Sequence, residues 1–155
     1  MQHRFAEPTQ CIYWDNPDLV RSTPMKELFE LIDTYEYESH LHRYLLKCRE
    51  CGQLYFFEFY EWVDWEHGND PQYTKYIPVP TVEDAQMLRK ASQAELLLFS
   101  PSLNIDFPRD AEASTMYWAG KVPSRPLPAS APEAALSSAA GETEKKSFWR
   151  RLFSR

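Results

Sequence analysis

The chain has 155 residues, of which 43% are hydrophobic and 15% aromatic, and this is enough for one packed domain. Residues 1–120 contain 10 Lys and Arg against 20 Asp and Glu, while the whole chain has a formal net charge of −6. An acidic body argues against binding of DNA or RNA, because phosphate backbones are bound by clustered Lys and Arg.

The cysteines and the apolar segments indicate the compartment. Three cysteines are an odd number, which does not suit a framework of disulfides. The first ten residues, MQHRFAEPTQ, lack the basic start and apolar run of a signal peptide. No stretch approaches the roughly 20 apolar residues that a membrane span needs. We therefore expect a cytoplasmic protein with reduced thiols.

The N-terminal part is predicted to contain one helix. Residues 1–22 show little periodicity, so we expect an irregular segment in which Cys11–Trp14 forms a short strand or packs on the core. Thr23 and Pro24 are typical of a helix start, where Thr caps free N–H groups and Pro is tolerated. The stripe of that helix would be Leu28, Leu31, Ile32 and Tyr35, with Glu27, Glu30 and Asp33 on the other side.

The spacing of the apolar residues changes from a helical to a strand pattern at Ser39. Residues 40–47 alternate in the way a strand does, and the turn Cys48–Gly52 then reverses the chain. The segment Gln53–Val63 has apolar residues on both faces, which predicts a central strand. Its aromatic residues are Tyr55, Phe56, Phe57, Phe59, Tyr60 and Trp62.

Shorter elements follow the hairpin. Tyr73–Val79 is predicted as a third strand, which Pro78 limits to an edge or to its own end. Thr81 and Ser92 each begin a capping signature, so we expect one helix from Thr81 and a second short helix at residues 96–99, which Ser100 and Pro101 end. Residues 103–107 and 115–118 alternate and are expected to pair as a closing hairpin.

The C-terminal part differs in composition. Residues 121–144 contain four prolines among Ala, Ser and Glu, which predicts a disordered linker. Residues 145–155 form a basic amphipathic tail, in which a helix would place Phe148, Trp149 and Phe153 on one side near Arg150 and Arg151. Such a tail either makes weak contact with an anionic membrane, docks on a partner, or is a functionless chain end.

Together these patterns predict an α+β fold. Residues 1–120 would form one compact domain, a small antiparallel sheet built on the central aromatic hairpin 40–63 and packed by two or three helices. The linker and a disordered C-terminal tail would follow it.

The Cys48–Gly52 turn is the strongest chemical signal. A Cys-x-x-Cys pair followed by Gly points two sulfur atoms the same way, so both reach one metal ion. The turn resembles one half of a zinc ribbon or zinc knuckle, and this resemblance implies a structural zinc ion. With no second Cys pair in the chain, we take His40 and His42 as the further ligands, and consider Cys11 and His67 as well. A metal-free turn and a redox dithiol are the competing interpretations.

The loop 64–71 is the second candidate site. Asp64, Glu66 and Asp70 are predicted to contact a partner, and with His67 they would also suit a hard cation or acid–base chemistry. A solvated turn between two strands accounts for the same composition. The spacing fits no calcium loop, and no phosphate loop or nucleophile elbow is present, so no catalytic residue is predicted.

These observations favour a noncatalytic function. We expect a small cytoplasmic protein of bacterial type that binds another protein through its acidic surface. Immunity proteins, which neutralise a toxin, share its size, charge and architecture, although this is an analogy only. One alternative is a metal-dependent enzyme that uses Cys48, Cys51 and nearby histidines. Another is a membrane-surface adaptor that binds through the basic tail.

Overall fold

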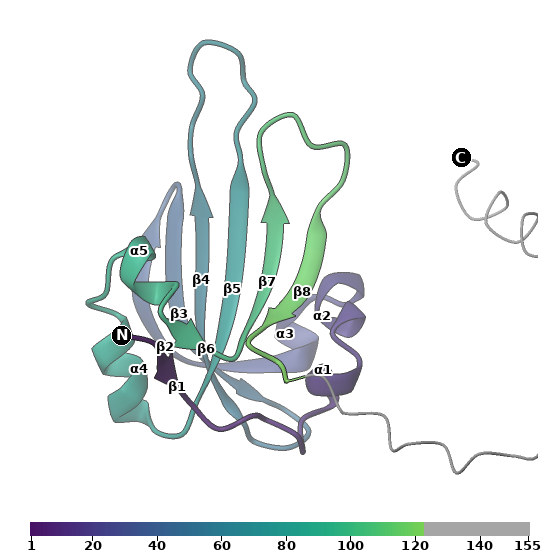
Figure 1. Ribbon diagram of the computed structural model, residues 1–155, viewed down its shortest axis with the longest axis vertical. Helices are drawn as coiled ribbons and strands as arrows, with labels where there is room; N and C mark the ends of the chain where they lie inside the picture. Colours follow the sequence, from purple (N-terminus) through teal and green to yellow (C-terminus); the bar gives the residue numbers. More distant parts are fainter. Residues whose placement is uncertain (123–155) are drawn as a thin grey trace, which may run out of the picture. The chain divides into compact units, whose positions relative to one another are not determined.

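The structure, a computed structural model, describes residues 1–122 (Figure 1). The linker predicted at residues 121–144, except for its first two positions, and the tail predicted at residues 145–155 lie outside the described residues. The partner-binding residues predicted there are Phe148, Trp149, Arg150, Arg151 and Phe153, and their role stays a prediction.

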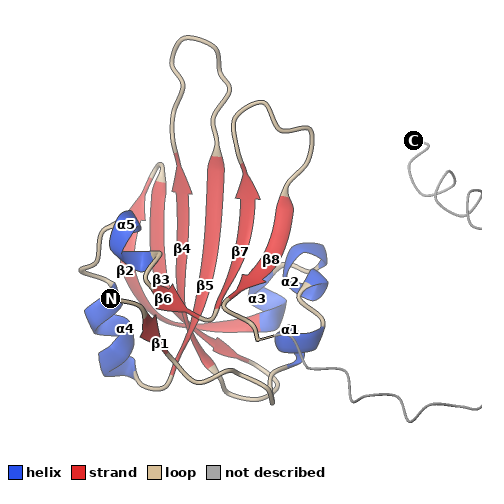
Figure 2. Ribbon diagram, viewed as in Figure 1, coloured by secondary structure: helices blue, strands red, loops and turns tan. Residues whose placement is uncertain are grey.

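The fold is α+β, as the sequence predicts. Six antiparallel strands form one sheet in the order β2-β3-β4-β5-β7-β8, and β1 pairs with β6 in a small parallel pair (Figure 2). The strands are β1 (His3–Arg4), β2 (Phe29–Glu38), β3 (Leu41–Cys48), β4 (Leu54–Glu61), β5 (Gln72–Val79), β6 (Phe99–Ser100), β7 (Ser102–Phe107) and β8 (Thr115–Ala119).

Five short helices accompany the sheet in the described part of the chain. They are α1 (Ile12–Asp15), α2 (Asp18–Ser22), α3 (Met25–Leu28), α4 (Val82–Leu88) and α5 (Gln93–Leu96). None of the described helices has the length and apolar character needed to cross a membrane.

The aromatic hairpin predicted at residues 40–63 is confirmed as the centre of the sheet. Strands β3 and β4 pair from Leu41 opposite Tyr60 to Lys47 opposite Leu54. Strand β4 is flanked by β3 and β5 and has Tyr55, Phe56 and Phe57 buried, as expected of a central strand.

The remaining strand and helix predictions in the C-terminal half of the domain are confirmed, except for the bounds of the second helix. Pro78 lies at the end of β5, where pairing with β7 has already stopped at Tyr76, so its missing N–H costs no bond there. The Thr81 side chain caps α4, and Ser92 and Glu95 form the capping box of α5. The helix predicted at residues 96–99 lies instead at Gln93–Leu96, because it starts directly after its Ser92 cap, and Phe99 belongs to β6. Strands β7 and β8 form the closing hairpin.

The helix predicted from Pro24 to Tyr35 is wrong beyond Leu28. Residues Phe29–Glu38 form the edge strand β2, which bonds to β3. The apolar residues of this segment fit a helical stripe by spacing, but the segment FELIDTYEYE is rich in aromatic and β-branched residues that pack well on a strand. Pairing with β3 provides backbone hydrogen bonds that decide between the two forms.

The N-terminal segment is more ordered than the sequence indicates. Residues predicted as irregular form α1 and α2, and Cys11, Tyr13 and Trp14 are buried. The prediction that Cys11–Trp14 packs on the core is therefore confirmed, whereas the alternative of a strand is wrong. Both helices are only one turn or slightly more, too short for a periodic signal.

The sheet has two faces with different covers. Successive residues of a strand point to opposite sides, so Tyr55 and Phe57 face one way and Phe56 and Glu58 the other. Tyr55 and Phe57 pack with Tyr13 and other residues of the N-terminal segment, and we call this the N-terminal face. Phe56 packs with residues of α4 and α5, and we call this the α4–α5 face.

Candidate metal centre

Two of the three cysteines are placed by the turn after β3. Cys48 is the last residue of β3, and its N–H donates to the Gln53 carbonyl at 2.8 Å. The Gly52 N–H donates back to the Cys48 carbonyl at 2.9 Å, which closes a tight turn. Gly52 has a φ of 79°, a left-handed conformation that disfavours any residue with a Cβ. The turn therefore holds Cys48 and Cys51 close together.

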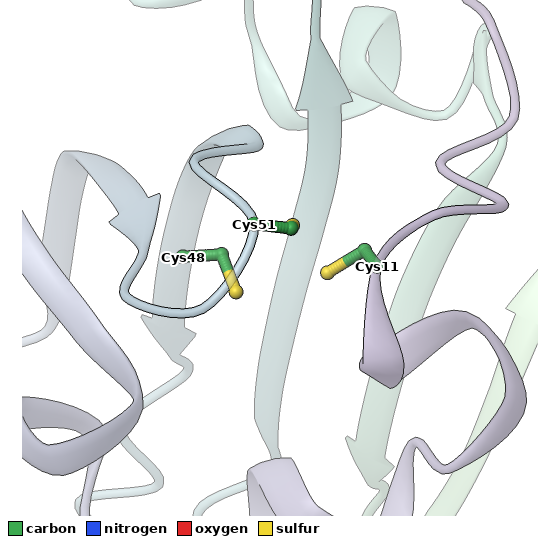
Figure 3. A group of neighbouring side chains, drawn as sticks. All are labelled: Cys11, Cys48 and Cys51. Atoms are coloured by element: carbon green, nitrogen blue, oxygen red, sulfur yellow. The ribbon is translucent and has the colours of Figure 1, made fainter.

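The third cysteine comes from the N-terminal segment. Cys11 lies immediately before α1, with its N–H bonded to the Pro8 carbonyl at 2.9 Å. The neighbouring Gln10 side chain donates to Gln53 at 2.9 Å and joins this segment to the end of the turn. Figure 3 shows Cys11 facing the turn from the opposite side. Two segments far apart in the sequence thus meet at one point.

The three thiols are close enough to share one ion. Their Sγ atoms all lie within 4.8 Å of one another. Zinc bonds to sulfur are about 2.3 Å, so two thiolates on a tetrahedral zinc are about 3.8 Å apart. Side-chain rotations that bring the sulfurs together by at most about 1 Å would therefore complete the geometry. Thiolates are the ligands that zinc and other soft metals prefer.

The surroundings of Cys48 favour its thiolate form. Burial by itself would raise its pKa, but the N–H groups of Cys51 and Glu50, the Cys51 thiol and the Tyr13 hydroxyl together outweigh that effect. The net result is a pKa below the ordinary thiol value. Hydrogen bonds to the charged form have the same effect at a metal-bound sulfur, which carries partial negative charge.

Cys11 behaves in the opposite way. Burial raises the pKa of the Cys11 thiol to about 12, and the nearby Tyr55 side chain offsets this only in part. Without a cation nearby, Cys11 is therefore a neutral thiol at physiological pH. A metal that binds there has to displace its proton, so metal binding and deprotonation are coupled at Cys11.

The Tyr55 hydroxyl is an unusual neighbour of the cluster. The side chain is 1% exposed, and its oxygen has no hydrogen-bond partner that meets ordinary geometric limits in the described part of the chain. Its strongest polar neighbour is Cys11, which together with burial raises the Tyr55 pKa. A buried hydroxyl without a partner costs about 1–3 kcal/mol. A metal-bound thiolate at Cys11 would accept a hydrogen bond from this hydroxyl, so the residues present fit a metal ion.

The two predicted histidine ligands lie elsewhere. His40 precedes β3 and His42 is near its start, whereas Cys48 is at its end, about 20 Å beyond His42 at 3.3 Å per residue. His40 Nδ1 is 3.2 Å from Glu61, and His42 stacks on Tyr37. The structure therefore joins Cys48 and Cys51 with Cys11, and it does not bring the histidines to them.

The acidic loop is organised by hydrogen bonds within itself. The Asp64 carboxylate accepts from Arg109 at 2.9 Å and from the N–H groups of Glu66 and His67. Asp70 accepts from the Asp64 N–H at 2.6 Å. Asp64 therefore stabilises the conformation of the loop through these hydrogen bonds, while the Glu66 side chain is exposed. Their predicted contact with a partner stays a prediction.

Sequence reasoning named Cys11 as one candidate among several and did not find Tyr55, which it assigned to the core. Tyr55 is a tyrosine in a strand where phenylalanine fills the equivalent buried positions, four residues after Cys51. A hydroxyl in such a place needs a partner, and that requirement is the signal that could have identified it.

Comparison with known proteins gives no match to any family model, curated protein or solved structure.

Proposed function

We propose that this chain is a noncatalytic domain whose N-terminal segment is fastened to the central hairpin by one zinc ion bound to Cys11, Cys48 and Cys51. The observation that carries the proposal is the meeting of three sulfur atoms, two of which come from a turn of zinc-knuckle type. The Tyr55 hydroxyl and the lowered pKa of Cys48 support it.

The surroundings favour a structural ion over a catalytic one. Cys11 and Cys48 are each 1% exposed, so a substrate could reach an ion there only from the side of Cys51. Cys51 is exposed, so the fourth position of the ion would be filled from that side. The ion would cross-link residue 11 to residues 48–51. Because the site is complete only in the folded chain, the free energy of metal binding would add to the stability of the fold.

Zinc content tests this proposal. Protein purified without chelators should contain about one equivalent of zinc, because three thiolates bind a single ion. Cys11→Ser and Cys48→Ser should each lose most of it, and each should lower the free energy of unfolding by about 3 kcal/mol. Wild-type protein with less than about a tenth of an equivalent of zinc would refute the proposal.

The matched control is a polar substitution elsewhere on an exposed surface. Thr115→Ala removes one exposed hydroxyl far along the chain and should leave zinc content unchanged. Treatment with a chelator should then lower the melting temperature of the wild type and the control, and it should have little effect on Cys48→Ser, which has already lost most of its zinc.

A second observation favours binding to another protein. Strand β2 is an edge strand of ten residues, and most of its side chains are exposed, including Leu31 at 56% and Tyr37 at 76%. An open edge offers free N–H and C=O groups to an added strand. Its exposed acidic residues are Glu30, Asp33, Glu36 and Glu38.

We propose that a partner with an extended basic segment pairs with this edge. An immunity-type role, in which the partner is a toxin, is consistent with such a surface. Capture from the native host should recover one stoichiometric partner with the wild type and with Val122→Arg, a substitution at an exposed apolar residue outside β2. Ile32→Arg in β2 should lose that partner. Equal capture by both variants would contradict the assignment of β2.

A further inference from the structure

A row of polar side chains crosses five neighbouring strands on the α4–α5 face. Arg43 of β3 lies opposite Glu58 of β4, and Glu58 lies opposite Lys75 of β5. Lys75 lies opposite Asn104 of β7, which in turn lies opposite Tyr117 of β8. Residues directly opposite in antiparallel strands point to the same side of a sheet. The five side chains therefore form one continuous row.

Hydrogen bonds hold this row in place. Arg43 donates from Nε to Glu58 Oε2 at 2.8 Å and from Nη1 to the Arg89 carbonyl at 2.8 Å. The charge of Glu58 is thus neutralised from the side of β3. Asn104 accepts from Lys75 Nζ and donates to the Ser102 carbonyl at 3.0 Å. The ammonium group of Lys75 has three protons, of which Asn104 takes one.

A pocket of about 450 Å³ lies over the row, within the size range of small-molecule sites. Glu58, Lys75 and Asn104 contribute to its lining. The next cross-strand row, in which Tyr60 lies opposite Tyr73 and Tyr73 opposite Asp106, contributes to it as well. The pocket is on the α4–α5 face, whereas Tyr55 at the cysteine cluster is on the N-terminal face.

The pocket combines opposite charges with aromatic walls. Lys75 and Asp106 occupy diagonal positions on β5 and β7, which places their Cα atoms about 7–8 Å apart. Asp106 accepts from the Tyr117 hydroxyl at 2.8 Å. Burial lowers the pKa of Lys75, while the nearby carboxylates of Asp106 and Glu58 act against that effect. Tyr73 and Tyr117 are partly exposed at the pocket, at 38% and 46%.

We propose that this pocket binds a small zwitterionic molecule with a flat apolar body, of the class of aromatic amino acids. Its carboxylate accepts from Lys75, its ammonium group donates to Asp106, and its ring lies among Tyr60, Tyr73 and Tyr117. With Glu58 neutralised by Arg43, the charges of Lys75 and Asp106 cancel. A ligand with both charges satisfies both groups, whereas a ligand with one charge leaves the other group desolvated without a partner.

Three compounds with the same ring and chain test the proposal on the wild-type protein. L-phenylalanine carries both charges, 3-phenylpropanoate only the carboxylate, and phenethylamine only the ammonium group. In NMR titrations, L-phenylalanine should give saturable shifts of the backbone amides of Lys75, Asp106 and Tyr117. Each single-charge compound should bind about tenfold more weakly or worse, because one charge-assisted hydrogen bond is lost.

Two variants assign the charges. Lys75→Met should weaken L-phenylalanine about tenfold and leave phenethylamine unchanged, whereas Asp106→Asn should weaken L-phenylalanine and leave 3-phenylpropanoate unchanged. Lys47→Met, at an exposed lysine of β3, is the matched control and should change nothing. Equal affinity for the three compounds, or no saturable shift with L-phenylalanine, would overturn the proposal even if a variant failed to fold.

Discussion

The two faces of the sheet use the same strands for different purposes. On the N-terminal face, tilted, edge-to-face and stacked contacts join the rings of Tyr13, Phe29, Tyr55, Phe57 and Tyr76, and the cysteines lie beside them. On the α4–α5 face, the apolar core under the helices is followed along the strands by a charged row and a pocket.

The difference follows from how much of each face is covered. Helices α4 and α5 have seven and four residues, so they cover only part of their face. Strand positions beyond them carry the polar row, whose buried members Arg43, Glu58 and Asn104 are held by hydrogen bonds and an ion pair. The comparison teaches that a short helical cover leaves part of a sheet face free for a polar row and a pocket.

The largest expected effect is at the buried ion pair of the α4–α5 face. Arg43 and Glu58 are 7% and 4% exposed, with Nη2 and Oε2 2.6 Å apart. Arg43→Met leaves a buried carboxylate without its partner, so the free energy of unfolding should fall by about 3–5 kcal/mol. Urea denaturation followed by circular dichroism measures the change.

The double variant Arg43→Met with Glu58→Leu sharpens the comparison. Removing both charges leaves no unpaired group, so most of the lost stability should return. On the N-terminal face, no such recovery is expected for the double variant Phe57→Leu with Tyr76→Phe. Each substitution there removes packing contacts, and the second substitution does not restore the contacts that the first one removed. A double variant on the α4–α5 face as unstable as Arg43→Met would contradict this account.

The next largest effect is the loss of thermal stability at alkaline pH in zinc-free protein. The folded pKa of Cys11 is about 12, above the roughly 8.5 of a thiol in an unfolded chain. The unfolded chain therefore loses a proton first, and stability present below about pH 8.5 is lost as the pH rises toward the folded value. Zinc-free protein should melt at lower temperature at about pH 10 than at about pH 7.

Two comparisons isolate Cys11 in that experiment. Cys11→Ala should reduce the pH dependence of the melting temperature in zinc-free protein, since the thiol is gone. Zinc-loaded wild type should show a smaller dependence, because a metal-bound sulfur is already deprotonated. An unchanged pH dependence in Cys11→Ala would show that other groups cause it.

A smaller effect with two signs is expected at Tyr55. In zinc-free protein, Tyr55→Phe removes a buried hydroxyl without a partner and should raise stability by about 1 kcal/mol. In the presence of zinc, the same variant loses a hydrogen bond to the Cys11 thiolate, so zinc affinity should fall about tenfold. Thermal unfolding and competition with a chromophoric chelator measure the two quantities. The same sign in both would contradict a role for the hydroxyl at the metal.

The smallest effect concerns the helix at the rim of the pocket. Ser92 caps α5, with its hydroxyl accepting from the Glu95 N–H at 3.2 Å. Ser92→Ala should lower stability by about 1 kcal/mol and leave zinc content unchanged, because α5 lies on the other face. Loss of zinc in this variant would show that the two faces are coupled.

Much of the fold could be predicted from local patterns. The alternation of residues 40–47 and the capping residues Thr81 and Ser92 specify their elements by themselves. Strand β2 could not be predicted in this way, because Leu28, Leu31 and Ile32 fit a helical period as well. Its form is decided by hydrogen bonds to β3, which are contacts that no local pattern contains.

The candidate site shows the same limit. The turn with Cys48 and Cys51 could be predicted, because spacing and Gly52 are local. The choice of Cys11 over the histidines could not, since 37 residues separate it from Cys48 and their approach depends on packing of the whole N-terminal segment. His40 and His42 are close in sequence to the turn but lie at the far end of a straight strand.

The measurement that tests the central claim most directly is X-ray absorption at the zinc edge on the purified protein. If Cys11, Cys48 and Cys51 hold one ion, the spectrum should show about three sulfur ligands at about 2.3 Å, and about two in Cys11→Ser that has been reloaded with zinc. A zinc environment of nitrogen and oxygen, or two sulfurs in both proteins, would contradict the claim.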